Sequence, residues 1–83
     1  MYHTYILQSL KDARYYVGQT EDMEARLKRH NLGEVHATKS RLPWRVVYTE
    51  DFPTRSEAFR REMEIKRYKS GILFKKLLGL WRE

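Results

Sequence analysis

Five side chains of the 83-residue sequence have the chemical types needed to cleave a phosphodiester bond: Tyr5, Tyr16, Arg26, His30 and Glu62. A carboxylate can hold a hard cation that polarises a phosphate, and a guanidinium can stabilise negative charge growing on the phosphoryl oxygens. Tyrosine and histidine can position water or transfer protons. The set has one acidic ligand, which favours a site for a single metal ion completed by water and phosphate over a two-metal site.

The two tyrosines lie in two runs of strand-forming residues, 2–10 and 14–19, which the polar residues 11–13 separate. This pattern predicts a β-hairpin. We expect an even-length loop, which places Tyr5 and Tyr16 on the same face of the sheet. Their neighbour Tyr15 should then point to the opposite face and pack there, while Gly18 leaves space for a close backbone approach.

Arg26 and His30 belong to a predicted helix over residues 21–32, with Thr20 as its N-terminal cap and Gly33 as its stop. At about 100° per residue, the inward stripe of this helix comprises Met23, Leu27 and His30. Arg26 lies about 60° from that stripe, at the border of the buried face. Arg26 could pair with Glu62 or bind a phosphate, and His30 could be a hydrogen-bonded core residue or an acid-base group.

Glu62 belongs to a second predicted helix, which starts with a capping box at residues 54–57 and runs to about Tyr68. Ala58 and Ile65 mark its inward stripe, and Glu62 lies about 40° from Ala58. An inward carboxylate is costly unless it is paired, hydrogen-bonded or bound to a metal. A nearby Lys or Arg could be its partner, or a metal ion could be.

The remaining elements complete an α+β fold. Residues 33–43 predict a basic loop and residues 44–50 a third strand, bounded by a turn around residues 51–53. Residues 71–81 predict a last helix, whose expected core residues are Ile72, Leu73, Leu77, Leu80 and Trp81. We predict a single domain over residues 1–83: a three-stranded antiparallel sheet flanked by helices, in the order β-β-α-β-α-α.

The composition favours a polyanionic partner, because the net charge is +6 and the isoelectric point is about 9.8. Lys39, Arg41 and Arg45 are the predicted nucleic-acid contacts. The sequence has no cysteine, so a bound metal would take oxygen or imidazole ligands. No basic leader or long apolar run is present, and we expect a soluble cytoplasmic protein without membrane association.

The order of the short motifs resembles the GIY-YIG nuclease domain over almost the whole chain. The segments that carry this resemblance are HTY at 3–5, YVG at 16–18, EARLKRH at 24–30 and SEAFRREMEIK at 56–66. The segment over residues 30–67 especially resembles the small stand-alone members of the family, which also includes the incision subunit of bacterial excision repair. His3 and Thr4 replace the Gly-Ile of the family name, Gln19 stands where some relatives have lysine, and the late asparagine of some members has no assignable counterpart.

The resemblance implies a divalent-metal-dependent endonuclease that hydrolyses DNA, with a role in DNA repair or recombination. Glu62 would bind Mg²⁺ or Mn²⁺, Arg26 would neutralise the scissile phosphate, and the other three residues, Tyr5, Tyr16 and His30, would orient water and transfer protons. So small a module predicts recognition of DNA structure rather than sequence, with RNA remaining open as a substrate.

Two other classes of function compete with this one. A nucleic-acid-binding module without catalysis would use Lys39, Arg41, Arg45, Lys75 and Lys76 on phosphates, with a steep dependence of affinity on salt. A protein-interaction module would expose residues 72–81 as a partner helix, although such an apolar stripe more often belongs to a core.

Overall fold

The structure is a computed structural model and describes residues 1–69 and 71–80. Its elements, in chain order, are β1 (Tyr2–Ser9), β2 (Tyr15–Thr20), α1 (Met23–Asn31), the 3₁₀ turn η1 (Lys39–Arg41), β3 (Trp44–Phe52), α2 (Arg55–Arg67) and α3 (Ile72–Leu77). The predicted order β-β-α-β-α-α is confirmed. Among the described residues, no helix combines the length and apolar character that crossing a bilayer requires.

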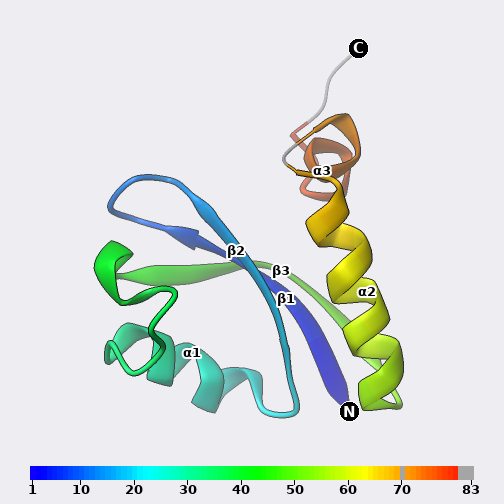
Figure 1. Cartoon of the computed structure of the whole chain (residues 1–83), viewed down its shortest axis with the longest axis horizontal. Helices are drawn as coiled ribbons and strands as arrows, with labels where there is room; N and C mark the ends of the chain where they lie inside the picture. The colour runs from blue at the N-terminus through cyan, green and yellow to red at the C-terminus, as the bar shows by residue number, and fades with distance from the viewer. Residues whose placement is uncertain (70, 81–83) are drawn as a thin grey trace.

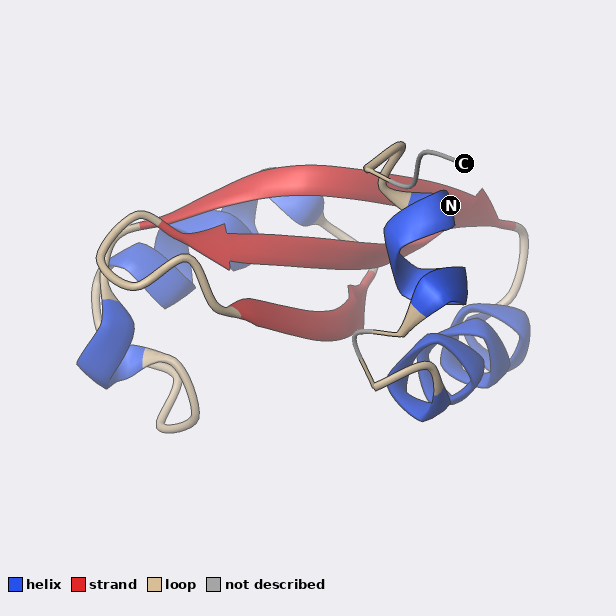
Figure 2. Ribbon diagram, turned by 90° about the horizontal axis from the view of Figure 1, so that it is seen from above, coloured by secondary structure: helices blue, strands red, loops and turns tan. Residues whose placement is uncertain are grey.

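The three strands form one antiparallel sheet in the spatial order β2-β1-β3, so the first strand is central. In the pairing of β1 with β2, Tyr5 lies opposite Gly18 and Leu7 lies opposite Tyr16. Because side chains alternate along a strand, Tyr5 and Tyr16 share a face, as predicted, and Tyr15 points to the other. Figure 2 shows the strands as a single layer with helical segments at both ends.

Each face of the sheet has its own core, and Figure 1 shows α1 on one side of the strands with α2 and α3 on the other. The α1 face buries residues from two strands and packs α1 against them: Tyr5, Leu7 and Trp44, with Tyr16, Met23, Leu27, Leu42 and Val46 around them. The α2 face buries a more apolar cluster: Ile6, Val17, Ile65 and Phe74, with Tyr15, Val47, Tyr48, Tyr68, Leu77 and Leu78 around them. The sheet therefore separates two environments only one strand layer apart.

The cap of α1 differs from the prediction. Thr20 is the last residue of β2, because its pairing with His3 keeps it extended, and Asp22 caps the helix instead. The side chain of Asp22 accepts a hydrogen bond from the backbone N–H of Ala25 at 3.1 Å. The predicted stop is correct: Gly33 has a φ of +77°, a conformation that glycine adopts without steric cost.

Helix α2 starts as predicted, since Thr54 caps it and accepts a hydrogen bond from the N–H of Glu57. Strand β3 is longer than predicted because Phe52 still pairs with Tyr2, so Asp51 and Phe52 belong to the strand rather than to a turn.

The expectation for the last helix is partly wrong. Helix α3 has six residues, and Gly79, with a φ of +73°, lies just past its cap. So short a helix turns one narrow face to the sheet: Phe74 is buried and Leu77 packs against the core, whereas three predicted core residues, Ile72, Leu73 and Leu80, are exposed. The predicted Trp81 lies outside the described residues.

Candidate active site

Tyr5 lies at the centre of a buried polar network on the α1 face. Its side chain is fully buried, its hydroxyl lies 2.9 Å from Nε2 of His30, and Nε of Arg26 donates a hydrogen bond to it at 3.3 Å. The other ring nitrogen of His30, Nδ1, lies 2.7 Å from the hydroxyl of Thr38, which is also fully buried. The Thr38 hydroxyl in turn lies 3.3 Å from the carbonyl oxygen of Val35.

If the imidazole of His30 is uncharged, one set of proton positions satisfies all four of these contacts. The Arg26 N–H can only donate and the Val35 carbonyl can only accept, so the chain has a fixed direction. Tyr5 accepts from Arg26 and donates its proton to Nε2 of His30, and Nδ1–H of His30 donates to Thr38. An uncharged His30 is therefore protonated on Nδ1.

Burial and charge agree with that assignment. Burial, together with the positive charges of Arg26 and Arg29, lowers the pKa of His30 to about 4. Burial also raises the pKa of Tyr5, although the hydrogen bond and charge of Arg26 oppose that change. At neutral pH, His30 is therefore uncharged and Tyr5 keeps its proton.

Arg26 presents its charge beside this network. Its side chain is half-buried, and the hydrogen bond to Tyr5 raises the pKa of its guanidinium, which stays charged. Within the described residues, the recorded hydrogen bond of this side chain uses Nε. The two terminal amino groups are therefore the part of the fork available for a phosphate.

Tyr16 is the more accessible tyrosine of the pair. Its ring lies edge-on to His30, with 5.2 Å between the ring centroids, and 6.5 Å from the ring of Tyr5. The side chain is half-buried, and in the described part of the chain the hydroxyls of Tyr5, Tyr15, Tyr48 and Tyr68 make hydrogen bonds whereas that of Tyr16 makes none. It can therefore meet a ligand, while Tyr5 cannot without a rearrangement.

Gly18 makes room for Tyr5 rather than for an incoming backbone. A Cβ atom at Gly18 would lie 2.5 Å from the Tyr5 hydroxyl and 2.6 Å from its Cζ. No real side chain tolerates such contacts, so the glycine lets Tyr5 cross beneath β2 towards Arg26. The opening predicted at this position exists, and the chain fills it itself.

Glu62 lies on the α2 face and is 8 % exposed, so the predicted inward carboxylate is confirmed. Its Oε2 atom lies 2.6 Å from Nζ of Lys66, one helical turn along α2. Arg26 makes its recorded hydrogen bond with Tyr5 instead of with this carboxylate. The negative charge of Glu62 nevertheless makes a small contribution to the raised pKa values of both Tyr5 and Arg26, so Glu62 lies close enough to act on the network.

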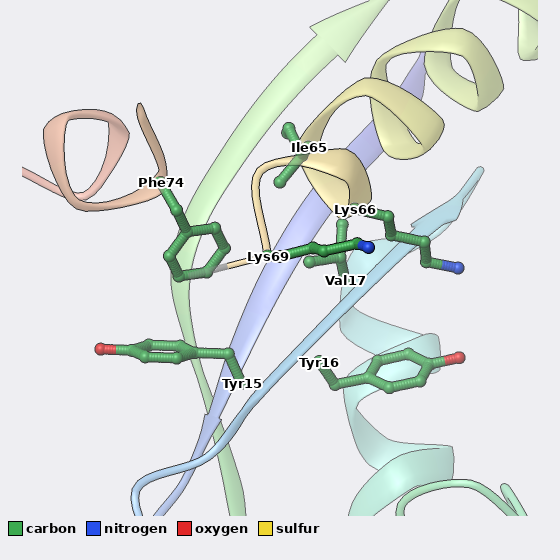
Figure 3. Close-up of a pocket in the computed structure, with 7 residues that line it drawn as sticks. All are labelled: Tyr15, Tyr16, Val17, Ile65, Lys66, Lys69 and Phe74. Atoms are coloured by element: carbon green, nitrogen blue, oxygen red, sulfur yellow. The ribbon is translucent and has the colours of Figure 1, made fainter. Parts of the chain in front are cut away.

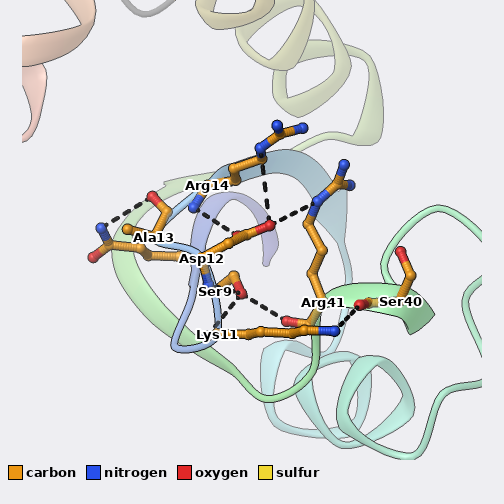
Figure 4. Close-up of polar contacts among 8 residues, drawn as sticks. Ser9, Lys11, Asp12, Ala13, Arg14, Ser40 and Arg41 are labelled. Atoms are coloured by element: carbon orange, nitrogen blue, oxygen red, sulfur yellow. Dashed lines mark hydrogen bonds and ion pairs between the residues drawn. The ribbon is translucent and has the colours of Figure 1, made fainter.

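The loop that holds Thr38 is tied to the hairpin turn (Figure 4). Ser9 donates a hydrogen bond from its hydroxyl to the Arg41 carbonyl at 2.7 Å, and Nζ of Lys11 donates to the Ser40 carbonyl at 3.2 Å. Arg41 also pairs with Asp12, at 3.0 Å. These contacts fix the loop against the sheet, and Nε1 of Trp44 donates to the Thr38 carbonyl at 2.9 Å, which holds Thr38 against His30.

The predicted nucleic-acid contacts lie near the hairpin turn between β1 and β2. Arg41 forms an ion pair with Asp12, and Arg45 donates a hydrogen bond to the Gln8 side chain at 2.9 Å. Lys39 is exposed. The structure therefore does not bring these three residues together with the five predicted site residues.

Two residues in contact with the predicted site residues, Thr38 and Lys66, were not predicted from the sequence. Lys66 had a signal, because a residue four positions after Glu62 lies on the same helical face. Thr38 lies in a loop without periodicity, and only tertiary packing places it on His30.

The donor set of this region offers a hard cation one carboxylate, that of Glu62. No group of three or more His, Asp or Glu side chains within residues 1–69 and 71–80 is arranged to hold a metal. Glu62 offers carboxylate oxygens, and a cation such as Mg²⁺ commonly takes one or two carboxylates and completes its shell with water and phosphate oxygens. Lys66 would have to leave Oε2 for a cation to bind there.

Comparisons with known proteins agree with this fold. A family model described as the GIY-YIG catalytic domain matches residues 1–74. A UPF0213 protein of Halobacterium salinarum is 40% identical over 67 residues, which are 80% of this chain and 86% of that protein. One from Staphylococcus saprophyticus is 43% identical over 67 residues, covering 80% and 82%. The solution NMR structure of a UPF0213 protein from Bacillus halodurans is 38% identical, with a TM-score of 0.60 over 96% of this chain and 85% of that one.

Proposed function

The chain belongs to the GIY-YIG catalytic domain family, a nuclease-type family, and on this premise we propose that it is a divalent-metal-dependent endonuclease that hydrolyses DNA phosphodiester bonds. The observation that carries the proposal is the fully buried chain of Tyr5, His30 and Thr38, which holds Arg26 by its Nε atom. Three buried polar side chains orient one arginine in this network, and a guanidinium oriented in advance is suited to a reaction in which charge develops on a phosphate.

Glu62 is the proposed ligand of Mg²⁺ or Mn²⁺. When bound, the cation supplies Lewis-acid stabilisation of the phosphate. The carboxylate itself contributes a fixed position, because it lies on a helix packed against the sheet and is nearly buried. It also adds negative charge where the guanidinium of Arg26 adds positive charge.

Arg26 is the proposed group that neutralises the scissile phosphate. Its terminal amino groups can form two parallel hydrogen bonds with phosphoryl oxygens while Nε remains bound to Tyr5. Because the guanidinium is already oriented, it needs little reorganisation when charge develops in the transition state.

Tyr16 is the proposed acid-base group. Its hydroxyl is accessible and makes no hydrogen bond within the described residues, so it can orient a water molecule, and its deprotonated phenolate form can take a proton from that water. Tyr5 and His30 are positioning residues in this account, because both are fully buried and act through Arg26 and through the ring of Tyr16.

The proposed substrate is DNA recognised by its structure, in repair or recombination. The net charge of +6 supports binding to a polyanion, with Lys39, Arg41 and Arg45 as backbone contacts at the hairpin end. Such contacts position a duplex without reading bases.

The test is nicking of plasmid and branched DNA with Mg²⁺ or Mn²⁺, comparing the wild type with Glu62→Ala and Arg26→Ala. Both variants should lose cleavage by about 10²-fold or more. Glu64→Ala is the matched control, since Glu64 lies on the same helix with its side chain exposed. Equal cleavage by the wild type and both site variants would contradict the mechanism.

A second function has one observation in its favour. Lys66 already neutralises Glu62, as in a purely structural ion pair, which suits a nucleic-acid-binding module without catalysis. Tight, salt-sensitive DNA binding with no metal-dependent cleavage would select that function.

A further inference from the structure

Lys66 binds one of the two carboxylate oxygens that Glu62 could offer to a metal ion. Its Nζ lies 2.6 Å from Oε2 of Glu62. An ammonium and a divalent cation bound to the same carboxylate repel each other, so the ion pair with Lys66 opposes metal binding. The carboxylate side chain is 11% exposed and fixed, whereas the lysine side chain is 44% exposed. Lys66 is therefore the partner that can move.

Lys66 also lines a pocket of about 280 Å³ between the edge strand β2 and the end of α2, together with Tyr15, Tyr16, Val17, Ile65, Lys69 and Phe74. Figure 3 shows the amino groups of Lys66 and Lys69 pointing to the same side of this pocket as the hydroxyl of Tyr16. The hydroxyl of Tyr15 points to the opposite side. Two ammonium groups thus adjoin the tyrosine proposed for acid-base chemistry.

The backbone of Lys69 supports a role for its side chain. Lys69 follows the cap of α2 and has a φ of +48°, in the left-handed region where glycine is the usual residue. A lysine here carries a steric cost that glycine would avoid, and it places a cationic side chain on the pocket. In the part of the chain that the structure describes, Lys69 joins none of the recorded ion pairs.

We propose that Lys66 and Lys69 bind a DNA backbone phosphate next to the scissile one, and that Lys66 reaches this phosphate by leaving Glu62. The exchange replaces one anionic partner of Lys66 with another and releases Oε2 for the metal ion. Substrate and metal therefore bind cooperatively, and the free protein holds the metal weakly. This inference rests on the proposed function, because it takes Glu62 as the metal ligand.

The first test measures Mn²⁺ binding to the full chain without DNA, by the electron paramagnetic resonance signal of free Mn²⁺. Lys66→Met should bind Mn²⁺ more tightly than the wild type. The expected increase in affinity is roughly fivefold or more, which is the lower end of the usual coupling between two binding events. Lys69→Met is the matched control: it removes the same charge from the same pocket without touching Glu62, and its affinity should equal that of the wild type. Lys66→Arg keeps an ion pair and should also behave as the wild type.

The second test adds branched DNA in an Arg26→Ala background, which suppresses cleavage during the titration. DNA should tighten Mn²⁺ binding by roughly fivefold in this background and much less when Lys66→Met is added. Thermal unfolding of each variant verifies that it is folded.

The outcomes separate this inference from the function on which it rests. If Glu62→Gln abolishes Mn²⁺ binding while Lys66→Met leaves the affinity unchanged or weaker, the exchange is wrong and the metal site stands. An equal effect of DNA with and without Lys66 would also overturn the exchange. If Glu62→Gln binds Mn²⁺ as the wild type does, both the exchange and the proposed metal ligand are wrong.

Discussion

The α1 face of the sheet buries a directed chain of hydrogen bonds, whereas the α2 face buries mostly hydrocarbon and one carboxylate. On the α1 face, Tyr5 donates a hydrogen bond to His30, and His30 donates one to Thr38. On the α2 face, Ile6, Val17, Ile65 and Phe74 form a core that needs no such matching. The α1 face therefore fixes the orientation of its side chains, and the α2 face contributes stability and a replaceable ion pair.

Adjacent tyrosines on β2 offer the largest expected contrast between the faces. Tyr16→Phe should lower the rate of DNA cleavage by about 10²–10⁴-fold, because it removes the proposed acid-base hydroxyl and keeps the ring. Tyr15→Phe should leave the rate nearly unchanged, since that ring packs edge-on to Phe74 on the opposite face. Single-turnover cleavage measures both. Equal losses in the two variants would remove the functional difference between the faces.

Acid should destabilise the protein through the α1 face. The pKa of His30 falls from 6.5 to about 4 on folding, so the unfolded chain binds a proton that the folded chain does not between these values. The stability due to neutral His30 is complete above pH 6.5 and is lost as the pH falls towards 4, by up to about 3 kcal/mol.

Urea unfolding between pH 4 and pH 7 measures this effect. The free energy of unfolding should depend less on pH in His30→Gln, which has no titrating group at this position. The same pH dependence in the wild type and in this variant would show that His30 is not held neutral by the fold.

A methyl group at Gly18 should break the α1 face from the edge strand. Gly18→Ala should lower the free energy of unfolding by about 1–3 kcal/mol, because the new Cβ would overlap the ring of Tyr5. In a Tyr5→Leu background the same change should cost much less, since the ring is gone. Urea unfolding of the four proteins completes the cycle, and additive costs would contradict the close approach.

The smallest expected effect is at Thr38. Thr38→Val keeps the shape of the side chain and removes the acceptor for Nδ1–H of His30, which should cost about 1–2 kcal/mol of stability. The maximal cleavage rate should also fall, while the metal concentration for half-maximal cleavage stays the same. Thr38→Ser retains the hydroxyl and should restore both stability and rate. Failure of serine to do so would assign the effect to packing.

Sequence patterns predicted the features that depend on local periodicity. Strand alternation placed Tyr5 and Tyr16 on one face, and helical spacing placed Glu62 inward. The errors arose where tertiary contacts decide: sheet pairing kept Thr20 in β2, and the early end of α3 left Leu80 exposed.

The site residues show the same division. Their elements follow from motif and period, but the fixed proton direction through His30 depends on Thr38, which a loop delivers from outside any periodic segment. The residues that flank Tyr5 and Gly18 in the sequence likewise do not predict that the Tyr5 ring packs under Gly18.

The most direct test of the different roles of Glu62 and Arg26 is to measure the single-turnover cleavage rate at increasing Mn²⁺ concentrations. The proteins compared are the wild type, Glu62→Gln and Arg26→Ala. Glu62→Gln should raise the metal concentration for half-maximal cleavage by roughly tenfold or more. Arg26→Ala should lower the maximal rate by about 10²–10³-fold with that metal concentration unchanged. If both variants change the same parameter, or if neither changes any, the account of a metal-binding α2 face and a charge-stabilising α1 face is contradicted.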